Sequence, residues 1–311
     1  MASQKPHPAL ARILRQGLSA DTVATLGDRL TASDLTTLLL EVARHRASRR
    51  TPTEVLRQYE QDRFVGPAAV GARLLLRLEQ AAMDAVGDTF TPVITAPLVP
   101  FGAHVATARV DQNIVVSTMR ATEVAADPTT SLALEAAVQR RALLADNARS
   151  AELIRLSTVT RVTRAQRFEG PRMFAHFCLL GLVTAGRDRG NQAFEQSALI
   201  EQVEALTAVV RACGFDRVVV KLSDLGGQHT RIIDAAILAL NGARVVCTHD
   251  PHRSAGRGYY PNVCFKLAVE CNGEEIEVGD GGIVDWTQSL LGNRKERLMT
   301  AGLSLERLAT L

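Results

Sequence analysis

The chain has 311 residues, 46% of them apolar, which is enough to bury the core of one large domain or of two ordinary ones. Its 36 basic and 33 acidic residues leave a formal net charge of only +3, so the composition does not indicate DNA or another nucleic acid as a partner. No apolar run approaches the length of a membrane-spanning helix, which excludes that class of protein.

The cysteines and the N-terminal segment indicate the cellular compartment. None of the five cysteines belongs to a C-x-x-C pair, so we do not expect a zinc site. An odd number of cysteines without a secretory signal is typical of reduced thiols in a cytosol, and residues 1–9 lack the apolar stretch of a signal peptide. The sequence therefore predicts a soluble, cytoplasmic protein.

The first part of the chain, residues 8–65, has apolar positions at helical spacing only. Thr51 to Glu54 forms the pattern of a capping box, with proline at the first helical position. The helix that starts there is predicted to turn three side chains inward: Val55, Leu56 and Tyr59. We expect a helical N-terminal domain over residues 1–70 that serves packing or binds a protein partner. The basic cluster at 44–50 is interpreted as a solvated helix end rather than an RNA contact.

From residue 71 the pattern becomes mixed. Helices are predicted around residues 74–82, 130–144, 194–213 and 232–240. Strands are predicted at 91–94, 113–118, 218–222, 245–248, 263–269 and 275–278, with Asn272-Gly273 as the hairpin turn between the last two. The irregular spacing and the hairpins favour an α+β core with a mainly antiparallel sheet. Neither a G-x-G-x-x-G nor a P-loop pattern follows a strand, which excludes those nucleotide sites.

Two segments combine arginines with features that suit a phosphate ligand. In residues 163–177, charged residues and a Gly-Pro pair lie between two apolar runs, as in a hairpin with a mobile, cation-rich loop. In residues 301–308, Gly302 precedes an apolar helix that carries an acid–base pair. An arginine holds phosphate oxygens through two parallel bonds, and an aromatic ring stacks on a purine. Taken alone, each segment would be an ordinary surface hairpin or helix.

Together and in this order, the two segments resemble motifs 2 and 3 of class II aminoacyl-tRNA synthetases. Between them, residues 257–265 resemble the Arg-Gly…Tyr-Tyr…Val-Phe stretch of the histidyl branch, and residues 281–285 resemble its Gly-Gly-Arg-Tyr-Asp. Upstream, residues 126–129 resemble the Ala-Asp-x-Thr segment of the synthetase-like regulatory subunit of ATP phosphoribosyltransferase. The resemblance covers about residues 85–311.

The resemblance implies the fold of a class II synthetase core over residues 71–311, with about six mainly antiparallel strands flanked by helices. Such cores are usually homodimers that pair through motif 1, whose terminal proline would here be Pro92 or Pro97. The chain stops at Leu311, just after the segment that resembles motif 3. We therefore expect no anticodon-binding domain and leave tRNA open as a partner.

The same resemblance implies an ATP site, with Mg²⁺ bridging the phosphates. Arg164 would hold the α-phosphate and Arg307 the γ-phosphate, while Phe177 would stack on adenine. Gln166 and Glu306 would complete the nucleotide site, with Glu306 supporting Arg307 rather than binding metal. The reaction would be attack of a carboxylate on the α-phosphate, giving an acyl-adenylate and pyrophosphate. Such chemistry depends on positioning and charge stabilisation, so two arginines suffice without a nucleophile of the protein.

The resemblance also implies a pocket for the acid beside the nucleotide. Its residues would be Asp127, Thr129, Leu179, Val183, Arg257, Tyr259, Tyr260, Gly281 and Gly282. Leu179 and Val183 stand where histidyl enzymes have a glutamine and a glutamate that read the imidazole. Two apolar side chains cannot hydrogen-bond an imidazole, so histidine is not the expected substrate. Arg257 is as well explained as a surface charge, and the two tyrosines as core and rim of the fold.

Three other polar segments have two interpretations each. Asp111 to Asn113, followed by Arg120 and Glu123, either lines the acid pocket or forms a polar turn. Asp224 to Gly227, after a buried strand, and His249 to His252 are interpreted as structural turns rather than sites.

The sequence supports two functions. The first is ATP-dependent activation of an amino acid or similar carboxylic acid, with transfer to a non-standard acceptor; Arg164, Arg307 and Phe177 favour it. The second is a non-catalytic paralogue that acts as a ligand-binding regulatory subunit. Gln166 in place of the motif 2 glutamate, and the apolar pair after Gly281-Gly282, favour this second function. We favour the enzyme.

Overall fold

The computed structural model describes residues 7–166, 174–242 and 244–311. Its contacts divide the chain into two compact units: Met1–Glu60 with Thr118–Ala121, and Gln61–Ser117 with Thr122–Leu311. The sequence had predicted a division after residue 70. No helix among the described residues is long and apolar enough to cross a membrane.

The N-terminal unit contains short helices followed by two longer ones: α1 (Leu10–Leu14), α2 (Thr22–Ala24), the π-helical turn η1 (Thr25–Arg29), α3 (Ala32–Ala47) and α4 (Pro52–Gln61). The predicted capping box of α4 is confirmed, because the Thr51 N–H donates to Glu54 Oε2 at 2.8 Å and the Glu54 N–H donates to Thr51 Oγ1 at 3.3 Å.

The expectation that α4 turns its apolar side chains inward is wrong. The exposed fractions of Val55, Leu56 and Tyr59 are 53%, 57% and 48%. None of the helices α1 to α4 buries a residue, so this unit offers no second apolar layer to cover that face. An amphipathic pattern gives the spacing of apolar positions in a helix, but not the presence of a surface that buries them.

The larger unit is built on an eight-stranded sheet with strand order β1-β4-β5-β10-β9-β8-β6-β7. These strands are β1 (Thr91–Pro92), β4 (Ile154–Thr163), β5 (His176–Arg187), β6 (Val218–Asp224), β7 (Val245–His249), β8 (Val263–Cys271), β9 (Glu274–Val284) and β10 (Glu296–Ser304). The six central strands are antiparallel to their neighbours, and the edge strands β1 and β7 pair in parallel. The mainly antiparallel α+β fold is confirmed, with two parallel edge strands beyond the expected six.

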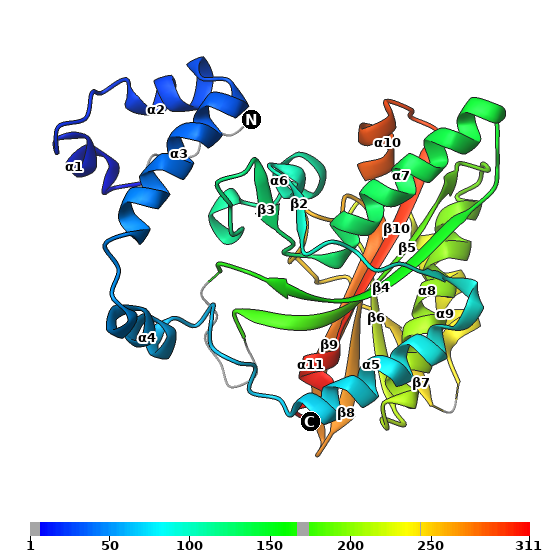
Figure 1. Ribbon diagram of the computed structural model, residues 1–311. Helices are drawn as coiled ribbons and strands as arrows, with labels where there is room; N and C mark the ends of the chain where they lie inside the picture. Colours follow the sequence, from blue (N-terminus) through cyan, green and yellow to red (C-terminus); the bar gives the residue numbers. More distant parts are fainter. Residues whose placement is uncertain (1–6, 167–173, 243) are drawn as a thin grey trace. The chain divides into compact units, whose positions relative to one another are not determined.

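Helices cover both faces of this sheet (Figure 1). On one face lie α5 (Ala72–Val86), α8 (Ala193–Ala212) and α9 (Thr230–Leu240), which form the larger apolar core. On the other lie α6 (Ala103–Ala108), α7 (Pro128–Asp146) and α10 (Trp286–Leu291) with a smaller core. Strand β5 contributes side chains to both cores. The larger core contains Cys178, Leu180 and Leu182, and the smaller core contains Val183 and Ala185.

Local signals in the sequence explain several element boundaries. Asp127 caps α7 by accepting a hydrogen bond from the Thr129 N–H, with proline at the first helical position. Asn272 and Gly273 both have positive φ (53° and 81°), which confirms the tight hairpin predicted between β8 and β9. The strand predicted at 113–118 is absent, because Asp111 instead caps the 3₁₀ turn η3 (Gln112–Ile114).

Four short elements complete the larger unit. The helix predicted after Gly302 begins later than expected, since β10 continues to Ser304 and only α11 (Leu305–Leu308) is helical. Apart from the main sheet, β2 (Leu98–Pro100) and β3 (Thr122–Val124) form a separate antiparallel pair. The 3₁₀ turn η2 (Gly87–Thr89) follows α5.

Candidate functional site

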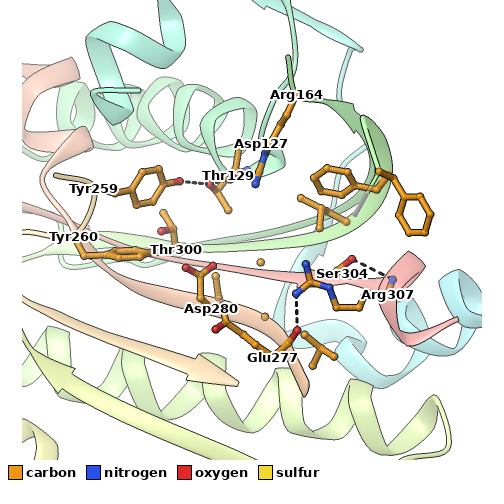
Figure 2. Close-up of a pocket in the computed structure, with 17 residues that line it drawn as sticks. Asp127, Thr129, Arg164, Tyr259, Tyr260, Glu277, Asp280, Thr300, Ser304 and Arg307 are labelled. Atoms are coloured by element: carbon orange, nitrogen blue, oxygen red, sulfur yellow. Dashed lines mark hydrogen bonds and ion pairs between the residues drawn. The ribbon is translucent and has the colours of Figure 1, made fainter. Parts of the chain in front are cut away.

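A cavity of about 220 Å³ opens over the middle of the sheet (Figure 2). It is lined by the start of α7, the segment after β4, both tyrosines before β8, and strands β5, β9 and β10 with α11. The lining residues are Asp127, Thr129, Arg164, Phe174, Phe177, Leu179, Tyr259, Tyr260, Glu277, Val278, Gly279, Asp280, Thr300, Ala301, Gly302, Ser304 and Arg307. Eight of the residues singled out in the sequence therefore meet at one place: Asp127, Thr129, Arg164, Phe177, Leu179, Tyr259, Tyr260 and Arg307.

Arg164 enters the cavity from the segment that follows β4. Its Nε donates to the Ala126 carbonyl at 2.8 Å, and its Nη2 donates to Asp127 Oδ2 at 3.2 Å. Its guanidinium lies 5.2 Å from the centre of the Phe177 ring, within the range of a cation–π contact. Arg164 is thus held by one carbonyl and one carboxylate, with its charge next to an aromatic face.

Arg307 enters from the opposite side of the cavity. Ser304 caps α11 by accepting a hydrogen bond from the Arg307 N–H at 3.2 Å, which fixes the start of this short helix. The side chain then extends towards the cavity, where Nη1 donates to the Glu277 carbonyl at 2.5 Å. Figure 2 shows the guanidinium on the side where Ser304 and Glu277 lie. One backbone carbonyl is a partner that an anion can displace.

Asp127 and Tyr259 meet through a threonine. Asp127 Oδ1 accepts from the Thr129 N–H at 2.9 Å and from Thr129 Oγ1 at 2.6 Å, and the Thr129 hydroxyl lies 3.3 Å from the Tyr259 hydroxyl. The Tyr259 ring contacts Tyr260 and Trp286 edge to face, at 4.7 and 5.2 Å between ring centres. Burial, and secondly the negative charge of Asp127, raises the pKa of Tyr259 well above its usual value, so its hydroxyl stays neutral.

Asp280 and Arg253 belong to the same end of the site, and the sequence reasoning missed both. Asp280 lines the cavity from β9, and Arg253 lies behind it with its Nη2 3.7 Å from Asp280 Oδ2 and its guanidinium 5.8 Å from the Tyr260 ring centre. The Asp280 side chain is 45% exposed, and it lines the cavity. Burial, followed by repulsion from Asp127, raises the pKa of Asp280 to about 6.

The comparisons with known proteins bear on the fold. No protein-family model matches the sequence, and no curated protein matches it. Among solved structures, apo histidyl-tRNA synthetase from S. aureus has a TM-score of 0.59 and 14% identity over 76% of this chain and 65% of its own. An ATP phosphoribosyltransferase regulatory subunit/histidyl-tRNA synthetase from Bacillus halodurans has a TM-score of 0.56 and 13% identity over 79% and 82%. A histidine–tRNA ligase subunit from Alicyclobacillus acidocaldarius has a TM-score of 0.56 and 13% identity over 78% and 94%.

The fold is that of a histidyl-tRNA synthetase core. The expectation from the sequence motifs is confirmed at this level. The chain spans only 65% of the length of the S. aureus synthetase. In the histidyl-tRNA synthetase fold of this chain, the segment that resembles motif 2 runs from β4 into β5, and the segment that resembles motif 3 runs from β10 into α11. Residues 167–173, between β4 and β5, lie outside the described residues. The mobile, cation-rich loop that the sequence predicts in the motif 2 segment falls there.

Within this synthetase fold, six residues expected at the nucleotide or acid do not line the cavity, and Gln166, Arg257 and Val183 are three of them. Gln166 is exposed, and its carbonyl accepts from Arg63 Nη1 at 2.9 Å. Arg257 is an exposed surface residue. Val183 is fully buried under α7 in the smaller core, although it shares a face of β5 with Leu179. Leu179 alone of the expected apolar pair lines the cavity.

Glu306 bonds to residues other than Arg307. Its side chain is fully buried, and its Oε2 accepts from Arg161 Nη1 at 2.9 Å and from the Cys178 N–H at 2.8 Å. These bonds join α11 to β4 and β5, so the role of Glu306 in the structure is to position the short helix that carries Arg307. The acid–base spacing in the sequence did not reveal that the two side chains leave α11 in different directions.

Gly281 and Gly282 lie under the cavity rather than in its wall. A Cβ on Gly281 would lie 2.5 Å from Phe265 Cε1 and 2.6 Å from the Thr300 carbonyl, and a Cβ on Gly282 would lie 2.6 Å from the Tyr260 ring. No L side chain fits at such distances without displacing its neighbours. The structural role of these glycines is therefore close packing of β8, β9 and β10.

A buried histidine–glutamate pair supports the Asp127 segment, and it was also missed. His104 and Glu123 are both fully buried, and His104 Nδ1 lies 2.6 Å from Glu123 Oε1. The Ala126 N–H donates to His104 Nε2 at 3.0 Å, so Nε2 is unprotonated and Nδ1 carries the proton. Arg164 donates to the carbonyl of Ala126, so this residue is bonded to Arg164 through its carbonyl and to His104 through its N–H.

The remaining polar segments are structural. Glu123 accepts from Gly102, His104 and Gln112 and does not line the cavity, so it and the polar turn at Asp111 do not belong to the acid pocket. Asp224 accepts the N–H groups of Gly226, Gly227 and His229, which confirms the structural turn after β6. No group of three metal-binding side chains occurs among the residues that the structure describes.

Proposed function

We propose that this protein binds ATP and activates an amino acid as its acyl-adenylate. The observation that carries the proposal is that Arg164 and Arg307, far apart in the sequence, face one cavity together with Phe177. Two guanidinium groups and an aromatic ring around one cavity suit a purine nucleotide with several phosphates. The histidyl-tRNA synthetase fold supports the same function by analogy.

In this proposal three side chains position ATP and stabilise the charge of its phosphates. Phe177 stacks on adenine, Arg164 binds the α-phosphate and Arg307 binds the γ-phosphate. A carboxylate oxygen of the amino acid attacks the α-phosphorus, the bond from that phosphorus to the bridging oxygen breaks, and pyrophosphate leaves. Arg164 stabilises the negative charge that grows on the α-phosphate oxygens in the transition state. No proton transfer is needed, because the attacking carboxylate is already ionised.

Mg²⁺ would enter with the phosphates of ATP rather than bind to a preformed protein site. The described residues contain no cluster of three metal ligands, and the buried Glu306 is already bonded to Arg161 and Cys178. The ion would neutralise phosphate charge, which is the chemistry it supplies to nucleotidyl transfer. The protein's own contribution would be the two arginines.

The substrate acid and the acceptor are further parts of the proposal. Leu179 puts an apolar side chain in the cavity, which disfavours recognition of an imidazole and supports an amino acid other than histidine. We extend the proposal to transfer of the acyl group to a non-standard acceptor and to a cytoplasmic homodimer; both stay predictions. Incubating the formed adenylate with small amines, carrier proteins and tRNA would test the acceptor, and sedimentation would test the dimer.

The test of activation is ATP–pyrophosphate exchange with each standard amino acid. We expect exchange with one amino acid or a few related ones, and its loss in Arg164→Ala and Arg307→Ala. Arg257→Ala is the matched control, because it also removes one arginine but lies on the surface outside the cavity. Exchange that persists in both cavity variants would contradict the proposal.

A regulatory subunit that binds an amino acid or nucleotide without turnover is the second candidate. One observation favours it: Gln166, which replaces the expected motif 2 glutamate, lies outside the cavity. One structural neighbour is named as an ATP phosphoribosyltransferase regulatory subunit/histidyl-tRNA synthetase. Calorimetric binding of ATP or an amino acid, with no exchange in any combination, would select this candidate.

A further inference from the structure

One end of the cavity carries two carboxylates that phosphate binding does not explain. Asp127 from the start of α7 and Asp280 from β9 both line it, and Figure 2 shows their carboxylates on the side where Tyr259 and Tyr260 lie, away from Arg307. The two charges interact, since Asp127 opposes the ionisation of Asp280. Two carboxylates that face one cavity and repel each other suit a ligand with positive charge.

Neither carboxylate is fully neutralised by its arginine. Asp280 has Arg253 as its only ion-pair partner among the described residues, at 3.7 Å, which is longer than a hydrogen bond. Asp127 is 3.2 Å from Arg164 Nη2, and Arg164 is the residue assigned to the α-phosphate in the proposed function. When Arg164 moves to an anionic ligand, Asp127 loses its partner as well. Asp127 is then left without an ion pair, and Asp280 keeps only the more distant Arg253.

The tyrosine beside Asp280 is a second observation that points to a polar ligand. Tyr260 is only 5% exposed and lines the cavity, and its hydroxyl makes no hydrogen bond within the described part of the chain. This hydroxyl is not one of the buried polar atoms that lack a partner, so it is open to the cavity, where a ligand can bond to it. Burial, followed by the charge of Asp280, raises the pKa of Tyr260 well above its usual value, so it is a neutral group that can accept or donate a hydrogen bond.

We propose that this cavity binds an amino acid with a positively charged side chain, whose α-ammonium group lies at Asp127 and whose side-chain cation lies at Asp280 beside Tyr260. This inference rests on the proposed function in using the same cavity, but it concerns binding and requires no turnover. Leu179 gives the same cavity an apolar side chain, which suits the methylene chain of such an amino acid. Asp280 is the specificity-determining residue of this site.

The first test uses the full chain and pairs of amino acids of similar shape that differ in charge. Calorimetric titration would compare L-lysine with L-norleucine, L-ornithine with L-norvaline, and L-arginine with L-citrulline. A charge-assisted contact predicts that at least one cationic member binds about tenfold or more tightly than its neutral partner. Equal or tighter binding of the neutral members, or no binding of any cationic member, would overturn the inference.

A parallel titration with ATP separates this inference from the proposed function. If ATP binds and no cationic amino acid does, the inference fails and the nucleotide site stands. If L-lysine or a related amino acid binds but supports no pyrophosphate exchange, the inference stands and the proposed activation fails.

The second test changes Asp280. Asp280→Asn keeps the shape of the side chain and removes its charge, so affinity for the cationic amino acid should fall about tenfold, to the level of its neutral partner. Glu275→Gln is the matched control, because it removes one negative charge from the same strand at a residue that pairs with Lys221 outside the cavity. Unchanged affinity in folded Asp280→Asn protein would overturn the inference.

A structural defect must be separated from a binding defect in this variant. Asparagine at 280 leaves the buried Arg253 without its ion pair, which can destabilise the fold on its own. The double variant R253Q/D280N removes both charges, and thermal unfolding would show that it is folded. Loss of affinity for the cationic amino acid in both folded variants is the expected result, and retention in the double variant counts against the proposal.

Discussion

Asp280 gives the site a pH dependence with a defined sign. Its pKa is raised to about 6 by burial and by Asp127, and Glu277 adds to this, whereas Arg253 and Arg164 act in the opposite direction. A protonated Asp280 is neutral and cannot hold a cation, so affinity for L-lysine should fall as the pH drops from about 7 to about 5. Calorimetry across this range would measure it. Asp280→Asn should remove most of the dependence, and an equally steep profile in that variant would contradict the assignment.

His104 should act on the site through Ala126. Replacing it with phenylalanine removes the acceptor for the Ala126 N–H and the donor to Glu123, and leaves buried polar groups without partners at a cost of about 1–3 kcal/mol. We expect lower thermal stability and, in protein that is still folded, weaker ATP binding, because the Ala126 carbonyl no longer holds Arg164 in place. Val105→Ala, on the exposed neighbour, is the control. Unchanged ATP affinity would limit His104 to a role in stability.

At the scale of single residues, the sequence revealed side chains that belong to a local pattern. Arg164, Phe177 and Arg307 were found because each lies in a segment with its own signature. Asp280 and Arg253 have no such signature: the first lies among glycines in a strand, and the second lies in a loop that carries several charges. Their importance depends on a contact between β9 and that loop, which only tertiary structure reveals.

Close packing of β9 against its neighbours predicts the effect of an added methyl group. Gly281→Ala would place Cβ 2.5 Å from Phe265 and 2.6 Å from the Thr300 carbonyl, so we expect a loss of about 1–3 kcal/mol in the free energy of unfolding. Gly258→Ala is the control, because nothing lies within 4 Å of its added Cβ. Urea denaturation would compare the two. Equal stabilities would show that the sheet adjusts without cost and that the glycines are not needed for packing.

At the scale of elements, the sequence predicted those that carry their own period or turn. Helices α5, α7, α8 and α9, the strand β6 and the Asn272-Gly273 hairpin were all predicted, because each has an apolar repeat or a turn dipeptide. The last two residues of β10, Leu303 and Ser304, were predicted as part of a helix. Strand β10 lies between β5 and β9 at the centre of the sheet, where both faces are buried, and its apolar run lacks the alternation that distinguishes a strand.

At the scale of the whole molecule, the site depends on the order of strands in the sheet. The two arginines approach each other because β10, near the end of the chain, lies directly beside β5 and leads into α11. Strand order cannot be derived from periodicity, since sequence-distant strands pair through contacts that no local pattern encodes. The resemblance to class II synthetases predicted a mainly antiparallel sheet of about six strands, and the structure confirms that fold. The identity of the ligand is a separate question that the fold does not answer.

The larger unit should fold and bind ligand without the N-terminal helices. Both apolar cores lie between Leu75 and Leu308, and every residue that lines the cavity lies between Asp127 and Arg307. Helices α1 to α4 bury no residue, so their removal takes no side chain from either core. A chain that begins at Gln61 is therefore expected to unfold at a melting temperature within a few degrees of the full-length protein and to bind ATP with equal affinity. Differential scanning calorimetry and isothermal titration on both chains would measure this. A lower affinity in a shortened chain that melts normally would instead assign the N-terminal helices a part in ligand binding, and a collapse of the melting transition would show that the larger unit depends on them for stability.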